Sequence, residues 1–173
     1  FGHEVTVGGR ALQSASSPDG FVARLDPRGS VTAVLGLGGR GDEQVATVLA
    51  LGDGAALVTG YTSGEASFGG VALRPGGSPA AFAARVEASG RVRWARSFGV
   101  SNTTLRGAAR LPDGGAAVVG IFAGTLVLGG TLRSLGRFDV FVAGLDAEGA
   151  VLWATSYGGA GDDLPNAIAS DAN

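Results

Sequence analysis

The chain of 173 residues contains no cysteine and only one histidine, His3. Without cysteine it has no disulfide, no thiolate metal site and no thiol nucleophile. A single imidazole near the start of the chain builds neither a histidine-based catalytic triad nor a metal site with several histidine ligands. The absence of these side chains excludes the enzyme classes that depend on them.

An excess of charge of one sign is also lacking. All thirteen basic residues are arginine, fifteen residues are acidic, and the formal net charge is −2. Because these charges are scattered, they form neither a basic stripe to neutralise a phosphate backbone nor an acidic tail to recruit a basic partner. We therefore expect no nucleic-acid partner.

Long hydrophobic runs are missing too, although 45% of the residues are apolar. Gly, Arg or Asp interrupts every apolar stretch before it reaches the ~20 residues of a membrane helix. The opening "FGHEVTVGG" has no charged segment followed by an apolar one, so this window holds no secretory signal. We expect a soluble domain with a packed core and no membrane insertion.

One phrase, by contrast, occurs three times. It begins at Phe21, Phe82 and Phe141, which are 61 and 59 residues apart, and a glycine follows each Phe after eight residues. A fixed period of this length is typical of repeat architectures. The sequence predicts a single repeat domain, 1–173, whose approximate units are 1–20 (partial), 21–81, 82–140 and 141–173 (partial).

Within each unit the hydrophobic period is two, which is typical of strands. "FVARLD" places Phe21, Ala23 and Leu25 on one face, and the turn "DPRG" links this half-buried strand to "VTAVLGL". A second hairpin turns at "GDG" or "PDGG", and its strands carry apolar or small residues on both faces, as central strands of stacked sheets do. A short extra hairpin turns on Gly-Gly. The sequence therefore predicts an all-β fold without helices.

Four strands per unit in sequential hairpins fit the blades of a β-propeller better than the shorter rungs of a β-helix. We predict an all-β fold of propeller blades, each a four-stranded antiparallel sheet, in an incomplete array of about three blades. Propellers close with about four to eight blades. By phase, Phe1 aligns with Phe122 and Asn173 falls near Gly114. The blade that the ends share would therefore have an unpaired edge, which we expect further sequence or another copy of the chain to cover.

The segment "FVAGLDAEGAVLWATSYGGAGDD", 141–163, resembles the bacterial propeller repeat called SBBP. That family repeats a Phe-Val-Ala-Lys-Leu-Asp strand, a Gly turn, a strand Trp and a Gly-Gly-x-Gly-Asp-Asp loop. The second copy loses the acidic loop to "GVSNTT", and the first has Ala33 in place of Trp. The resemblance covers essentially the whole chain and implies an extracellular or surface-exposed bacterial protein of undefined activity.

Two acidic pairs follow glycine-rich turns and are the weak calcium candidates of this chain: Asp42 with Glu43, and Asp162 with Asp163. Neighbouring carboxylates supply the hard oxygen ligands that calcium prefers, but a site needs six to eight oxygens. The alternative is a solvated turn in which Asp caps local amides. No other cofactor is expected.

Residues 40–42 spell Arg-Gly-Asp, an integrin-recognition motif. The tripeptide occupies the loop position at which the other copies read "SNTT" and "AGDD". Three residues carry little information, and a functional loop would also have to project freely. Drift between repeats is the preferred interpretation.

Two tryptophans occupy the same position in their copies, with an aromatic residue four positions later. Trp94 is followed by Phe98 and Trp153 by Tyr157, while the first copy has Ala33. Core packing predicts that both indoles are buried in equivalent places between adjacent sheets. The alternative is an exposed aromatic platform for a sugar ring.

The resulting hypothesis is a non-enzymatic propeller repeat module of an exported or surface bacterial protein. It would serve binding, with a protein or a glycan as ligand, or structural scaffolding, and the turns that differ between copies would supply the contacts. No residue is singled out as catalytic. The alternative is a fragment of a propeller hydrolase or carbohydrate-binding protein whose site residues lie on blade loops.

Overall fold

The computed structural model describes residues 1–14, 18–99 and 101–171. This part of the chain consists of strands joined by turns and contains no helix, hence none that is long and apolar enough to cross a membrane. The strands are β1 (Glu4–Val7), β2 (Arg10–Gln13), β3 (Gly20–Leu25), β4 (Val31–Gly39), β5 (Glu43–Ala50), β6 (Ala56–Thr62), β7 (Ala66–Phe68), β8 (Val71–Leu73), β9 (Ala80–Val86), β10 (Val92–Phe98), β11 (Thr103–Arg110), β12 (Ala116–Phe122), β13 (Thr125–Val127), β14 (Thr131–Arg133), β15 (Asp139–Leu145) and β16 (Val151–Tyr157).

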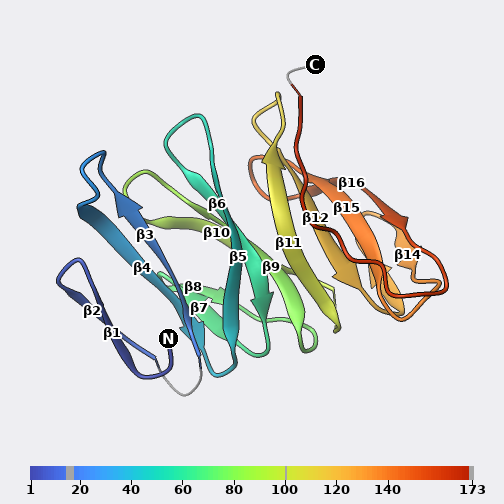
Figure 1. Cartoon of the computed structure of the whole chain (residues 1–173), viewed down its shortest axis with the longest axis horizontal. Helices are drawn as coiled ribbons and strands as arrows, with labels where there is room; N and C mark the ends of the chain where they lie inside the picture. The colour runs from blue at the N-terminus through green and yellow to red at the C-terminus, as the bar shows by residue number, and fades with distance from the viewer. Residues whose placement is uncertain (15–17, 100, 172–173) are drawn as a thin grey trace.

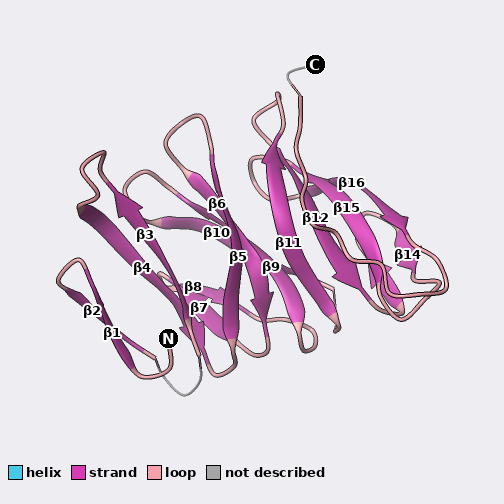
Figure 2. Ribbon diagram, in the orientation of Figure 1, coloured by secondary structure: helices cyan, strands magenta, loops and turns pink. Residues whose placement is uncertain are grey.

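The strands form three four-stranded antiparallel sheets and two separate hairpins, β1-β2 and β13-β14. The first sheet has the order β3-β4-β7-β8, the second β5-β6-β9-β10 and the third β11-β12-β15-β16. They stand side by side along the long axis of the molecule (Figure 1), and the strands are joined by loops and turns without any helix between them (Figure 2). The predicted all-β fold with four-stranded antiparallel sheets is confirmed, while the described residues do not close into a ring.

The second and third sheets each take their strands from two sequence units, whereas the strands of the first sheet belong to the one unit that begins near Phe21. In the second sheet, β5 and β6 come from the end of one unit, and β9 and β10 open the next. The short hairpin β7-β8 leaves this sheet between β6 and β9 and pairs with β4 of the first sheet, with Leu37 opposite Phe68. The hairpin β7-β8 thus ties the second sheet to the first.

Burial on both faces marks the strands in the middle of the sheets. Every residue of β9 and of β12 is buried, and each strand has a hydrogen-bonded neighbour on both edges. In addition, β9 has a packed sheet on both of its faces, because its residues belong to the cluster with the first sheet and to the cluster with the third. The expectation of two-faced burial for the second hairpin is confirmed for β12 and for most of β6, but it is wrong for β5 and β11, in which at least every second residue is exposed or half-buried. The half-buried expectation is wrong for β9, which is buried throughout, and also for β3, whose predicted apolar face is exposed at Phe21 and Leu25.

The core lies between the sheets. Phe68 and Phe82 meet edge to face with ring centroids 4.8 Å apart, and Phe122 and Phe141 do so at 6.1 Å. All four rings are fully buried. Burying one such side chain contributes about 1.5–3 kcal/mol, so the sheet-to-sheet contacts are the main source of stability.

The turns between the outer two strands of each sheet follow the predicted pattern. Gly90 and Gly149 have φ angles of 84° and 75°, a region that glycine enters without a Cβ penalty. The backbone N–H of Gly149 donates to the carbonyl of Asp146 at 3.1 Å, and Gly90 donates to Glu87 at 2.8 Å. These turns place the next residues against the neighbouring sheet.

Candidate functional site

The contact between the second and third sheets is built around Trp94, on β10. Its indole reaches across to the turn that follows β15, and Nε1 donates to the carbonyl of Ala147 at 3.0 Å. A Cβ on Gly149 would stand only 2.8 Å from the ring. We call this contact, Trp94 with the turn 146–149, the second joint.

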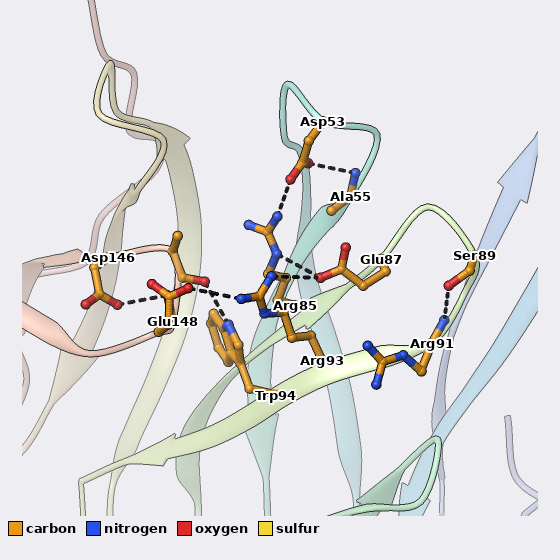
Figure 3. Close-up of polar contacts among 11 residues, drawn as sticks. Asp53, Ala55, Arg85, Glu87, Ser89, Arg91, Arg93, Trp94, Asp146 and Glu148 are labelled. Atoms are coloured by element: carbon orange, nitrogen blue, oxygen red, sulfur yellow. Dashed lines mark hydrogen bonds and ion pairs between the residues drawn. The ribbon is translucent and has the colours of Figure 1, made fainter.

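Charged side chains of β10 hold the same turn from the outside (Figure 3). Arg93 lies 3.2 Å from a carboxylate oxygen of Glu148 and 3.8 Å from one of Glu87. The Nε of Arg96 donates to the carbonyl of Glu148 at 3.1 Å. Exposed pairs of this kind contribute little individually, but together they fix the turn that covers the indole.

Arg85, on β9, is the buried cation of this region, with a side chain that is 7% exposed. Its guanidinium donates to a carboxylate oxygen of Asp53 and, through Nε, to Glu87 at 3.2 Å. The backbone N–H of Ala55 and, after it, Arg85 hold the pKa of Asp53 below its ordinary value. The positive charge of Arg85 is therefore balanced by two carboxylates, and its role is structural.

The contact between the first and second sheets is built from different side chains. Ala33, on β4, stands where Trp94 stands in the second sheet, and a Cβ on Gly90 would lie 3.8 Å from its methyl group. Arg24 bridges the opening, donating to the carbonyl of Ala88 at 2.6 Å and to that of Gly54 at 2.8 Å. We call this contact the first joint.

A cavity of about 330 Å³ occupies the first joint, partly open to solvent. At the second joint the remaining volume is only about 10 Å³. The walls correspond position by position. Gly54, Ala56 and Ala88 line the first, and Gly114, Ala116 and Ala147 line the second. The missing indole at position 33 accounts for part of the difference, and the opening of the first cavity to solvent for the rest.

Trp153 does not occupy the buried place predicted for it. Its side chain is 44% exposed and lies over Gly144 on the neighbouring strand β15, and Tyr157 is 61% exposed. Trp94 is covered by the turn of the sheet that follows it, whereas no described sheet follows β16. The prediction of equivalent burial is therefore wrong for Trp153 and half right for Trp94, which is partly buried.

The first predicted acidic pair is split between surface and interior. Asp42 is exposed, while Glu43 is 4% exposed and accepts a hydrogen bond from Thr62 Oγ1 at 2.7 Å. Burial, together with the carboxylates of Asp19 and Asp42, raises the pKa of Glu43 from 4.5 to about 7. Among the described residues, Glu43 Oε2 and Asp19 Oδ1 have no hydrogen-bond partner.

This pair lines an open hollow of about 490 Å³, whose wall also includes Phe21 and Tyr61. Asp19 was missed by the sequence analysis. An alignment of the repeats could have found it, because Asp139 stands at the same position of the third copy, two residues before the Phe. There the buried carboxylate accepts the N–H groups of Leu135 and Gly136 at 3.0 and 3.1 Å.

The second predicted acidic pair makes local contacts. Asp163 accepts the N–H of Gly159 at 2.8 Å, and Asp162 lies 3.8 Å from Arg137. Both contacts match the alternative of a solvated, capped turn. Within 1–14, 18–99 and 101–171, no three His, Asp or Glu side chains gather so as to hold a metal ion. Calcium binding stays a prediction.

The Arg-Gly-Asp tripeptide is fastened to the loop after β6. The N–H of Arg40 donates to Glu65 O at 3.0 Å, and that of Asp42 donates to Ser63 Oγ at 2.6 Å. A Cβ on Gly41 would lie 2.4 Å from the backbone nitrogen of Gly64. A loop packed in this way does not project as an adhesive tip.

Comparison of the sequence with protein-family models and with curated proteins found no match. The two joints and the acidic hollow are therefore interpreted from their geometry. Of the residues singled out in the sequence, the structure brings Trp94 into a packed joint and Glu43 into a buried pair with Asp19. It places Asp162 and Trp153 at the surface.

Proposed function

We propose that the chain is a non-enzymatic repeat module, of the SBBP type, from an exported or surface bacterial protein. Its role is to hold binding loops, or the domains beside it, on a rigid stack of sheets. The observation that supports this proposal most directly is the recurrent joint. The same glycine turn meets the preceding sheet at Gly90 and at Gly149, whatever side chain stands opposite.

The strand order supports the propeller as the architecture of the module. In both the second and the third sheet the strands follow one another in chain order across the sheet. The second sheet is β5-β6-β9-β10 and the third is β11-β12-β15-β16. Their first strands face each other, since Thr47 Oγ1 donates to the carbonyl of Arg106 at 3.2 Å. This is the arrangement of blades whose first strands line a central axis.

Completion of the ring requires further blades or another copy of the chain. The mass in solution tests the second possibility, because two copies with three sheets each fit a six-bladed ring. We expect a dimer in which Trp153 is protected from solvent. A monomer at all concentrations contradicts completion by a second copy and leaves further blades as the remaining route.

A second candidate function is a carbohydrate site in the acidic hollow, and the observation that favours it is the meeting of Asp19 and Glu43 with Phe21 and Tyr61. Glycoside hydrolysis needs two carboxyl groups about 5–10 Å apart, one on each side of the scissile bond. Besides burial, the carboxylate of Asp19 acts directly on Glu43 and raises its pKa, which suits a structural contact better than two groups on opposite sides of a scissile bond. Carbohydrate binding without hydrolysis remains compatible with the aromatic wall.

Activity assays distinguish these functions. The chain is offered aryl glycosides and soluble oligosaccharides, with Glu43→Gln as the matched variant. The non-enzymatic proposal expects no turnover that depends on Glu43. Turnover that disappears in Glu43→Gln, while the folded state is retained by circular dichroism, overturns it in favour of a hydrolase.

A further inference from the structure

We propose that the cavity of the first joint is a binding site for one planar bicyclic aromatic molecule of the indole type. The chain itself supplies the template. At the second joint the corresponding space holds the indole of Trp94 and leaves about 10 Å³, whereas at the first joint about 330 Å³ is free. A free indole-sized molecule at the first joint therefore replaces the side chain that Ala33 lacks.

The volume suits such a ligand. Small-molecule pockets begin at about 300 Å³, and an apolar cavity on the order of 150 Å³ already binds benzene. A fused two-ring molecule is larger than benzene and fits within 330 Å³. The cavity is also reachable, because it is partly open to solvent.

The walls are apolar on both sides of the cavity. Aliphatic side chains of the first sheet face those of the second across it, and alanines cover much of the remaining wall. The aliphatic residues are Val22, Leu35, Val48, Leu51 and Val86. A flat aromatic ring between two sheets gains contact on both faces, as the Trp94 indole does at the second joint.

A polar anchor stands at the matching place. The carbonyl of Ala147 accepts the indole N–H of Trp94 at 3.0 Å, and Ala88 is the corresponding residue of the first joint. Its carbonyl accepts from Arg24 at 2.6 Å, and a carbonyl oxygen has a second lone pair for another donor. The guanidinium of Arg24 also lines the cavity and adds cation–π attraction to a bound ring.

This inference goes beyond the proposed scaffold role and does not depend on it. The site needs only the first and second sheets and the turn 87–90, so it is retained whether or not the sheets belong to a ring. Conversely, a failure to bind indole leaves the recurrent joint and the proposed module intact. The two proposals are thus tested separately.

The experiment is calorimetric titration of the whole chain with indole. We expect one site per chain and a rise in melting temperature with indole. In Ala33→Trp the tethered indole occupies the site, so binding should weaken at least tenfold. In the matched control Leu152→Trp, which adds the same side chain at a position that is 54% exposed, binding should be unchanged. N-methylindole, which has no N–H donor, should bind about three- to tenfold more weakly than indole.

A second variant keeps the test decisive if Ala33→Trp fails to fold. Trp94→Ala should open the equivalent cavity at the second joint, so that the number of indole molecules bound per chain rises from one to two. Three results overturn the proposal: no binding by the wild-type chain at about 1 mM indole, unchanged binding in a folded Ala33→Trp, or a stoichiometry that stays at one in a folded Trp94→Ala. If N-methylindole binds as tightly as indole, the ligand does not donate a hydrogen bond to the carbonyl of Ala88, and that part of the proposal is wrong.

Discussion

The indole of Trp94 rests on Gly149, the turn glycine of the next sheet, with so little space that a Cβ there would lie 2.8 Å from the ring. Gly90 faces Ala33 in the same way across the preceding joint, at 3.8 Å. The same turn conformation thus occurs at both joints, although an indole faces it at one and a methyl group at the other. The stability of the molecule, and the cavity in it, follow from what stands opposite these two glycines.

Truncation should affect the two tryptophans unequally. Trp94→Ala should lower the free energy of unfolding by about 3–5 kcal/mol, because it removes a ring packed between two sheets and leaves a cavity. Trp153→Ala should lower it by about 1 kcal/mol or less, because that side chain is 44% exposed and surface changes cost little. Urea unfolding of both variants measures the difference. Equal losses would contradict the exposure of Trp153.

Replacement of the turn glycine separates backbone strain from steric contact. Gly29→Ala should cost about 1–2 kcal/mol, because φ is 82° and L-residues are strained there, while no atom lies within 4 Å of the new Cβ. Gly149→Ala should cost about 1–3 kcal/mol more, since the Cβ also collides with Trp94. In the double variant with Trp94→Ala that extra cost should disappear. If the two single variants unfold alike, Gly149 does not support the indole.

The buried carboxyl of Glu43 should make stability depend on pH. Its pKa is raised from 4.5 to about 7 in the folded chain, so the folded state binds the proton more tightly than the unfolded state. The associated stability is fully present below pH 4.5 and is lost as the pH rises through 7. The loss should amount to roughly 3 kcal/mol. Urea unfolding at a series of pH values measures it.

Glu43→Gln is the variant that tests this assignment. It should flatten the dependence between pH 4.5 and 7 and should be more stable than the wild type at pH 8, because it keeps a hydrogen-bonding side chain without charge. The matched control is Glu65→Gln, whose carboxylate is 68% exposed beside Arg74, and it should keep the wild-type dependence. A wild-type profile in Glu43→Gln would assign the slope to another group.

Because the sequence is repetitive, its strands and turns could be predicted. The strand at Phe82 and the turn at Gly90 were both predicted, because period-two alternation and turn glycines are local signals. The assignment of strands to sheets was not predicted. The spacing of Phe82 and Phe141 fixes the length of a unit but leaves open where in the unit one sheet ends.

Burial and the site itself depend on neighbours that a local pattern does not name. Trp94 and Trp153 read alike in sequence, yet only Trp94 has a following sheet to cover it. Ala33 was visible as a departure from the repeat, but its consequence, a cavity of about 330 Å³, needed the facing sheet. Asp19 and Glu43 are 24 positions apart and meet only because β5 begins a new sheet beside β3.

The buried carboxylate of Asp139 should be a structural group of the third sheet. It is 2% exposed and accepts two backbone N–H groups, from Leu135 and Gly136. Asp139→Ala should therefore destabilise the fold by about 1–3 kcal/mol, since it leaves these donors without their acceptor. Asp162→Ala, whose partner Arg137 is exposed, should change stability by about 0.5 kcal/mol or less. Thermal unfolding of both decides, and the reverse order would contradict the assignment.

The most direct measurement of the equivalence of the two joints is the free energy of unfolding of Ala33→Trp. If Ala33 faces the turn of Gly90 as Trp94 faces the turn of Gly149, the added indole occupies part of an existing cavity of about 330 Å³, and the fold should gain about 0.5–2 kcal/mol. Its fluorescence should then be blue-shifted relative to an exposed indole. A loss of stability of about 1–3 kcal/mol, the usual result of overpacking, together with emission typical of a solvent-exposed indole, would contradict a repeated joint between the sheets.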